Sequence, residues 1–392
     1  PNKENTSGVH GSPLGENEFD LFLQNIGFSG DPFTHDSTIY SYFDDKRNKD
    51  NSNYDEWKVN LESKLKSDMN FMKLWNQFNS FEIPEVELEW TSDEASRVIG
   101  GKILNEYGLS NKFIIGGSAD LAASTKQIIS DNLFGPNNFG GNSVEFGVRE
   151  HAMGGIVNGL ALHSNLMPYG STFLVFSDYM RPSIRLASLM KVNSLFIFTH
   201  DSIYLGEDGP THQPIEHLMS LRLIPDLDVI RPANSKELAY SYKYAFENRE
   251  NPKVIILSRQ NIKFLEQDIA YDDFQTGAYE FKSGKDISLV TTGSELELAV
   301  EISTELKDLS VQIISAPILN KLNEKRLKSL NLNQNIFTIE LGRSVGWDTY
   351  IKNINKSFSI DSFGESAPIE QLSEKFKFNS KKISDEIRTL LY

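Results

Sequence analysis

The chain has 392 residues, a formal net charge of −15 and no cysteine. This length exceeds one ordinary core and predicts two domains. The acidic balance argues against nucleic acid as a main partner, because no basic stripe is available to neutralise phosphates. The absence of cysteine excludes disulfides and thiolate metal sites. No apolar run reaches the length of a membrane-spanning helix, so a membrane partner is not expected either.

The N-terminal part carries few functional signals. His10 lies in a run of glycine and proline, where a lone histidine is more often a turn or surface residue than a catalyst. Residues 32–53 are rich in Asp, Lys and Asn, which predicts a loop or an insertion. Residues 54–78 are predicted to form a connecting helix, because apolar side chains recur on one stripe: Trp57, Leu61, Leu65, Met69 and Met72.

The middle of the chain alternates between helix and strand patterns. A helix is predicted over 93–106, and Asn234 followed by Glu237 forms a capping box for a helix that ends near 248. Continuous apolar runs predict strands at 113–117, 195–199, 228–230 and 254–257. Continuous runs between helices indicate a parallel sheet buried on both faces, and therefore an α/β fold.

The same pattern restarts after a polar joint at 263–277. A strand is predicted at 287–291 and a helix at 295–309, and further strands follow at 311–315 and 336–340. This segment is expected to form a second, smaller α/β domain.

One stretch, 144–155, combines a sharp polar turn with the start of a helix. The following helix contains Gly154, Gly155 and Gly159, each of which costs about 1 kcal/mol relative to alanine, so close packing is expected there. Glu150 lies in the turn. It is either a functional carboxyl or simply a negative charge that complements the helix dipole.

Polar residues directly follow three of the predicted strands. Ser118 and Asp120, then His200 and Asp201, and finally Arg259 are expected at one edge of the sheet, where open α/β sheets bind ligands. In the loop after His200, Asp208 and His212 are four residues apart. This loop has three possible interpretations: a rigid surface turn, a metal site formed by His200, Asp208 and His212, or a site for proton transfer and hydroxyl binding. The metal site is less favoured than the proton-transfer site.

Three aromatic residues, Phe173, Phe176 and Tyr179, recur at intervals of three. This spacing is typical of a helical core stripe. The alternative is an aromatic slot for a flat heterocycle.

Ordered motifs along the chain resemble those of transketolases. They lie at residues 148–154, 172–174, 199–214, 257–261 and 363–368. The resemblance implies the tail of a diphosphate-binding domain plus a linker helix at 1–85, a pyrimidine-binding domain at 86–265 and a C-terminal domain at 266–392. It further implies a cytoplasmic, thiamine-diphosphate-dependent enzyme of the pentose phosphate pathway that transfers a two-carbon ketol unit from a ketose phosphate to an aldose phosphate.

The resemblance also implies roles for individual residues at the cofactor. Glu150 matches the glutamate that hydrogen-bonds N1′ of the aminopyrimidine, which requires a neutral carboxyl and therefore burial that outweighs the helix dipole. The cofactor pocket would include Phe173, Phe176, Tyr179, Asp120 and His10. His10 and His212 join Glu150 as expected catalytic residues.

The substrate roles follow in the same way. Arg97, Ser124, His200 and Arg259 match the site for the substrate phosphate, since guanidinium groups bind two oxygens at once. Asp208 matches the residue that reads a donor hydroxyl, and His212 matches one near the reacting oxygens.

The sequence departs from the family at its start. A Gly-Asp-Gly…Asn motif for Mg²⁺ and the diphosphate is absent from the sequence, which begins at Pro1. The expectation is therefore a chain that lacks most of the diphosphate-binding domain, holds no metal ligands of its own and is inactive alone. That domain would be supplied by a longer chain or by a separate subunit.

Assembly and alternative activities complete the expectation. Family members are homodimers, which implies a homodimer here. A related activity, that of a 1-deoxyxylulose-5-phosphate synthase, is the alternative enzyme. The alternative from another class is a non-catalytic dimerisation or regulatory subunit.

Overall fold

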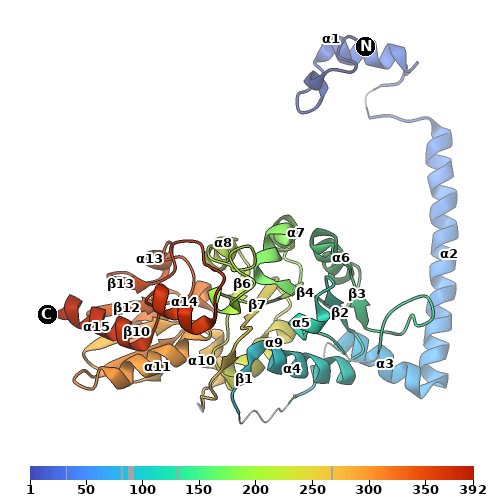
Figure 1. Cartoon of the computed structure of the whole chain (residues 1–392). Helices are drawn as coiled ribbons and strands as arrows, with labels where there is room; N and C mark the ends of the chain where they lie inside the picture. Colours follow the sequence, from blue (N-terminus) through green and yellow to red (C-terminus); the bar gives the residue numbers. More distant parts are fainter. Residues whose placement is uncertain (32, 81–82, 87–91, 130–131, 266–267) are drawn as a thin grey trace. The chain divides into compact units, whose positions relative to one another are not determined.

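The computed structural model describes residues 1–31, 33–80, 83–86, 92–129, 132–265 and 268–392 (Figure 1). The chain divides into two units, Pro1–Asn76 and Gln77–Tyr392, and each is described by itself. The predicted domain boundary at 265/266 falls partly outside the described residues, because residue 266 is not among them. Within the described ranges, no helix has both the length and the apolar character needed to cross a bilayer.

The first unit is helical and corrects the prediction for 32–53. It contains η1 (Ser7–Val9), α1 (Glu16–Asn25), α2 (Ser37–Ser67) and the start of α3 (Met69–Ser80). The Asp36 carboxylate caps α2 by accepting a 2.8 Å hydrogen bond from the Thr38 amide. No residue of α2 is buried in the described structure. Residues 44–53 contain no apolar side chain, so no apolar stripe marked this part of the sequence as helical. The predicted helix 54–78 is interrupted at Asp68, which has extended backbone angles.

A six-stranded sheet organises the first part of the second unit and confirms the predicted parallel α/β architecture. Its order is β3-β2-β4-β5-β7-β6, and every pairing is parallel. The strands are β2 (Ile114–Ser118), β3 (Ser143–Glu145), β4 (Met167–Phe173), β5 (Leu195–Thr199), β6 (Asp228–Ile230) and β7 (Lys253–Leu257). The sequence prediction missed β4, because Pro168, Gly170 and Ser171 interrupt its apolar pattern.

Helices cover both faces of this sheet. The buried core on one face includes α4 (Ser96–Ser110) and α9 (Ser235–Glu247). The core on the other face includes α6 (Glu150–His163), α7 (Ser177–Leu189) and α8 (His217–Arg222). Along β5, Leu195 and Ile197 enter the first core while Phe196 and Phe198 enter the second. This double burial explains why the strands read as continuous apolar runs.

The predicted cap of α9 is confirmed, with one difference. The Asn234 side chain accepts a 2.9 Å hydrogen bond from the Glu237 amide. The Glu237 carboxylate accepts its backbone bond from Ala233 at 2.6 Å, not from Asn234. Short elements complete this part: β1 (Glu94–Ala95) paired with β8 (Asn261–Ile262), α5 (Ala122–Thr125), η2 (Leu174–Phe176), η3 (Ile203–Leu205) and α10 (Tyr271–Gln275).

The close packing expected along α6 occurs at one glycine. A Cβ on Gly154 would lie 2.7 Å from Cβ of Ser183 on α7. Gly155 and Gly159 face open space, so the expectation is wrong for these two. The predicted apolar face is also only partly buried, since Met153 and Val157 are buried while Ile156 is 49% exposed.

The second sheet has five strands in the order β13-β12-β10-β11-β9, with only β9 antiparallel to its neighbour. The strands are β9 (Tyr279–Lys282), β10 (Ile287–Thr291), β11 (Val311–Ser315), β12 (Asn335–Ile339) and β13 (Ile354–Phe358). The accompanying helices are α11 (Glu295–Glu305), η4 (Leu319–Lys321), α12 (Glu324–Leu330), α13 (Trp347–Tyr350), α14 (Ile369–Lys375) and α15 (Ser380–Leu391). The predicted smaller α/β domain is present, although β9 and β13 were not predicted.

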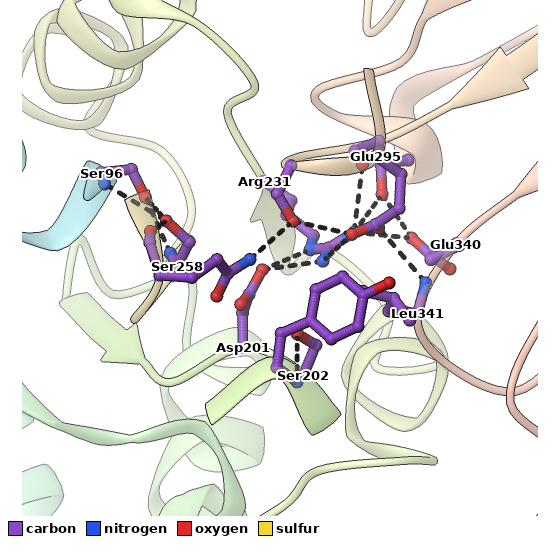
Figure 2. Close-up of polar contacts among 12 residues, drawn as sticks. Ser96, Asp201, Ser202, Arg231, Ser258, Glu295, Glu340 and Leu341 are labelled. Atoms are coloured by element: carbon purple, nitrogen blue, oxygen red, sulfur yellow. Dashed lines mark hydrogen bonds and ion pairs between the residues drawn. The ribbon is translucent and has the colours of Figure 1, made fainter. Parts of the chain in front are cut away.

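A buried cluster of charges joins the two sheets (Figure 2). Arg231 follows β6, and its guanidinium contacts Asp201 at 2.7 Å and Glu295 at 3.0 Å. Arg222 binds Glu340 through both terminal nitrogens, at 2.7 and 2.8 Å. Burial disfavours the charge on Arg231, but Glu295 and Asp201 outweigh it and raise the pKa of the guanidinium. The cluster therefore holds β5, β6 and the C-terminal sheet in one arrangement.

Candidate functional site

The strand ends bring the predicted polar residues to one edge of the parallel sheet. Asp120 follows β2, His200 follows β5 and Arg259 follows β7. Asp120 and His200 both adopt left-handed backbone angles, with φ of 61°. Such angles are uncommon for residues other than glycine and occur at functional sites. The shared conformation turns the chain sharply as it leaves the sheet.

A cavity of about 410 Å³ lies at this edge. Glu150 is the first residue of α6, and it lines the cavity together with Asp120. Phe176 in η2 and Tyr179 in the first turn of α7 supply aromatic rings. The remaining lining is apolar and comes from Ala119, Leu121 and Val148. The cavity thus pairs carboxyl groups with flat apolar surfaces, which suits a planar heterocycle that carries polar ring atoms.

The three aromatic residues do not form a helical stripe, so that interpretation is wrong. Phe173 ends β4, whereas Phe176 and Tyr179 belong to the two helical segments that follow. Phe173 is buried and does not line the cavity. Its ring stacks on that of Phe176, at a centroid distance of 5.7 Å, and on that of His200, at 3.7 Å. Phe173 therefore supports the half-buried ring of Phe176 and connects it to His200.

Two arginines, Arg97 and Arg259, lie close enough to His200 for their charges to act on it. Arg97 and Arg259 both line a second cavity of about 690 Å³. Burial, and after it the charges of Arg97 and Arg259, together lower the pKa of His200 to about 3. Burial and then Arg259 also lower the pKa of Arg97. His200 is consequently neutral at physiological pH, and the group offers two cations and one neutral imidazole to an anionic ligand.

Two serines hold the arginines together, and the sequence analysis missed both. The Ser258 amide donates to the Ser96 hydroxyl at 2.7 Å, and the Ser96 amide donates to the Ser258 hydroxyl at 3.2 Å (Figure 2). These bonds tie the start of α4 to the end of β7, one residue away from each arginine. Ser124 contributes its backbone carbonyl, which accepts a hydrogen bond from Arg97.

The side chain of Gln213, which was not among the predicted site residues, holds the loop after β5 in place through hydrogen bonds. The Gln213 side-chain amide donates to the carbonyls of Ile203 at 3.2 Å, Gly206 at 3.0 Å and Glu365 at 2.9 Å. A Cβ on Gly364 would lie 1.8 Å from the Gln213 side-chain oxygen, so a larger residue there would displace this side chain. The 363–368 motif therefore anchors this loop. The 363–368 motif was recognisable in the sequence, but its contact with Gln213 could not be predicted from it.

The structure places the other predicted residues as follows. His212 presents its ring edge to Phe176 at 5.6 Å, and Thr211 contacts its Nδ1 at 2.9 Å. Asp208 is exposed on the loop. Asp201 is turned into the junction with Arg231 and away from the ligand edge. His10 ends η1 in the first unit, so its role at the cofactor stays a prediction.

The metal alternative for His200, Asp208 and His212 receives no support. Among the described residues, the group whose ligand atoms lie close enough to share an ion is Asp178, Glu216 and His217. This group lies outside the set expected from the sequence.

Family models match three consecutive segments of the chain. "Transketolase, thiamine diphosphate binding domain" matches residues 1–84. "Transketolase, pyrimidine binding domain" matches residues 95–263. "Transketolase-like TK C-terminal domain" matches residues 277–379. The order of these matches is that of an enzyme class that uses thiamine diphosphate.

Individual relatives agree with the models. A transketolase of Staphylococcus aureus is 36% identical over 414 residues, which cover 100% of this chain and 62% of that protein. The structure of transketolase from Leishmania mexicana superposes with a TM-score of 0.90 at 28% identity, over 97% of this chain and 58% of that one. A Pichia stipitis transketolase in complex with sedoheptulose-7-phosphate gives a TM-score of 0.89 at 28% identity, over 98% and 60% of the two chains.

The chain belongs to the transketolase family. It spans about 62% of the length of the curated relative. The expectation that it lacks most of the diphosphate-binding domain is not borne out, because the model of that domain matches residues 1–84.

Proposed function

We propose that this chain carries out the transketolase reaction, in which a two-carbon ketol unit moves from a ketose phosphate to an aldose phosphate. One observation carries the proposal: the carboxyl of Glu150 and the rings of Phe176 and Tyr179 line one cavity. The substrate class is supported by the sedoheptulose-7-phosphate bound to the Pichia stipitis relative.

The lining of the cavity fits the aminopyrimidine of thiamine diphosphate. Phe176 and Tyr179 offer flat surfaces for the ring, and Glu150 offers a hydrogen bond to a ring nitrogen. When bound, thiamine diphosphate supplies a carbon nucleophile that stabilises negative charge during cleavage of the sugar. Glu150 would hold a proton at the ring nitrogen, while Phe173 keeps Phe176 in position behind it. Mg²⁺ is an expected companion of the diphosphate and stays a prediction.

The cationic group beside this cavity fits the substrate phosphate. Arg97 and Arg259 would bind its oxygens, and His200 would donate a hydrogen bond from its neutral ring. His212 lies against Phe176 and would contact the reacting oxygens, and the exposed Asp208 would accept a hydrogen bond from a substrate hydroxyl. Ser124 would act mainly through Arg97, to which its carbonyl is bonded.

The proposed assembly is a homodimer. Large apolar side chains are exposed along α6 and α7, namely Ile156, Leu162, Leu186, Leu189 and Met190. A cluster of this kind marks a protein contact surface. Light scattering coupled to size-exclusion chromatography is expected to give twice the monomer mass, and Leu189→Lys is expected to shift that mass toward the monomer. The cytoplasmic location stays a prediction.

The test is a calorimetric titration with thiamine diphosphate and Mg²⁺, made on the natural protein that contains this sequence. Glu150→Gln is expected to weaken binding at least tenfold and to abolish turnover, because the amide cannot hold the proton in the same way. Glu106→Gln, an exposed carboxyl on α4, serves as the matched control and is expected to change neither. Equal affinity and activity in the Glu150 variant would contradict the proposed role.

A donor assay separates the alternative activities. Sedoheptulose-7-phosphate with an aldose phosphate acceptor is expected to support turnover. Turnover with pyruvate as the only donor would instead indicate a 1-deoxyxylulose-5-phosphate synthase. Turnover with neither donor would favour a dimerisation or regulatory subunit and the predicted inactivity of the chain alone.

A further inference from the structure

Three metal-ligating side chains meet outside the proposed cofactor cavity. Asp178 lies in the first turn of α7, and Glu216 and His217 lie at the start of α8. His217 Nε2 is 3.2 Å from an Asp178 carboxylate oxygen, and His217 Nδ1 is 3.9 Å from a Glu216 carboxylate oxygen. One ligand atom from each of the three residues can be chosen so that all lie within 4.8 Å of one another.

His217 provides the observation that raises this cluster above ordinary surface charge. Its side chain is only 5% exposed, whereas those of Asp178 and Glu216 are 60% and 57% exposed. Neither ring nitrogen forms a hydrogen bond with any residue in the described part of the chain. A buried imidazole whose nitrogens face two carboxylates without hydrogen bonding to them is unusual, because buried polar groups normally have partners.

The direction of the His217 ring, and not the spacing, argues against a direct hydrogen bond, while the spacing is compatible with shared coordination. The 3.2 Å contact between His217 and Asp178 is short, yet the ring N–H is not directed at the oxygen. Two ligand atoms that each lie about 2.1 Å from one ion, at an angle near 100°, are separated by about 3.2 Å. The observed contact therefore has the separation expected of adjacent ligands of a metal ion.

We propose that Asp178, Glu216 and His217 bind a divalent transition-metal ion, with Zn²⁺ as the favoured ion. One imidazole and two carboxylates are a donor set that Zn²⁺ accepts, and the two negative charges offset the cation. Mg²⁺ prefers oxygen ligands throughout, so the imidazole discriminates against it. This site is distinct from any Mg²⁺ that accompanies the diphosphate.

The metal would link two segments that also reach the cofactor cavity. Tyr179 follows Asp178 directly and lines that cavity, while His212 precedes Glu216 by four residues. An ion would hold the first turn of α7 against the segment that leads into α8. This consequence for the cavity rests on the proposed function, whereas metal binding itself does not.

The test uses the natural protein after treatment with a chelator, without thiamine diphosphate or Mg²⁺. Calorimetric titration with Zn²⁺ is expected to show one equivalent bound, and Co²⁺ is expected to give visible absorption bands from nitrogen and oxygen ligands. Asp178→Asn and His217→Gln are each expected to weaken Zn²⁺ binding at least tenfold. His163→Gln, an exposed histidine at the end of α6, is the matched control.

Folding and specificity are checked in the same experiment. Asp178 is exposed, so Asp178→Asn is expected to keep the melting temperature of the metal-free protein, and Zn²⁺ is expected to raise that temperature in the wild type only. A tenfold excess of Mg²⁺ is expected to leave the Zn²⁺ isotherm unchanged. Absence of a single-equivalent site, or the same affinity in the Asp178 and His217 variants, would overturn the proposal, whatever the outcome for Glu150.

Discussion

At the scale of single residues, His200 shows how the site prepares for an anion. Its ring is stacked on Phe173, and burial together with the smaller effect of two guanidinium groups disfavours its protonation. A protonated His200 would repel Arg97 and Arg259, whereas a neutral ring can still donate one hydrogen bond. The pairing of two fixed cations with one uncharged donor therefore avoids like-charge repulsion when no ligand is bound.

The lowered pKa of His200 predicts a specific pH dependence of stability. The pKa is about 3 in the folded state, against an ordinary value of 6.5, so below pH 6.5 the unfolded chain binds a proton that the folded chain does not. This residue therefore lowers the free energy of unfolding as the pH falls from 6.5 toward 3, by up to about 1.4 kcal/mol per pH unit. His200→Asn is expected to remove this dependence in urea unfolding at pH 7.0 and 5.5.

The control for this experiment is His163→Gln, which removes an exposed histidine. It is expected to leave the difference between the two pH values close to that of the wild type. If His200→Asn and the wild type lose the same stability between the two pH values, the buried and neutral state of His200 is wrong.

At the scale of elements, helices α6 and α7 each contribute a residue to the lining of the proposed cofactor cavity. Glu150 opens α6 and Tyr179 lies in the first turn of α7, so the distance between these helices sets the width of the cavity. Gly154 allows the close approach, and Asn158 strengthens it by donating a 2.9 Å hydrogen bond to the Ser183 carbonyl. The packing of the two helices thus determines the separation of two proposed cofactor contacts.

A matched pair of glycine variants tests this packing. Gly155→Ala places a methyl group in open space and is expected to stabilise the protein by about 1 kcal/mol through helix propensity. Gly154→Ala has the same propensity gain but crowds Ser183, so its stability is expected to fall below that of Gly155→Ala by about 1–3 kcal/mol. Urea unfolding measures both. Equal effects of the two substitutions would show that the helices do not need this close approach.

At the scale of the whole second unit, buried charge connects the two sheets. Asp201 comes from the end of β5, Arg231 from the end of β6, and Glu295 from the start of α11 in the C-terminal domain. All three side chains are at most 2% exposed. Because each ion depends on the others for compensation, the relative position of the two domains is strongly specified.

Removing the central cation is expected to be costly. Arg231→Met leaves Asp201 and Glu295 buried without their partner, which predicts a loss of about 3–5 kcal/mol in the free energy of unfolding. Arg388→Met breaks the exposed pair with Asp308 at 2.9 Å and is expected to cost far less stability, because water screens exposed ion pairs. Urea unfolding compares the two variants. A loss below 1 kcal/mol for Arg231→Met would mean that the junction does not depend on this cluster.

Several features of the fold and the candidate site were readable from the sequence. The strands at 195–199 and 254–257 are continuous apolar runs, and the cap at Asn234 is a local signal, so neighbouring residues alone determine both. Parallel strands place their carboxyl ends at one edge, which made the grouping of Asp120, His200 and Arg259 predictable. The ordered motifs from 148 to 368 pointed to the transketolase family.

Other features were decided only by the tertiary structure. The stacking of Phe173 on His200, the Gln213 bond to Glu365, and the paired hydrogen bonds of Ser96 with Ser258 join segments far apart in the sequence. The same is true of Asp201, whose carboxylate turned toward Arg231 instead of the ligand edge. Local patterns determine which backbone element forms, because those forces act between near neighbours. The partner of a polar side chain depends on which distant elements are packed together, and no local pattern contains that information.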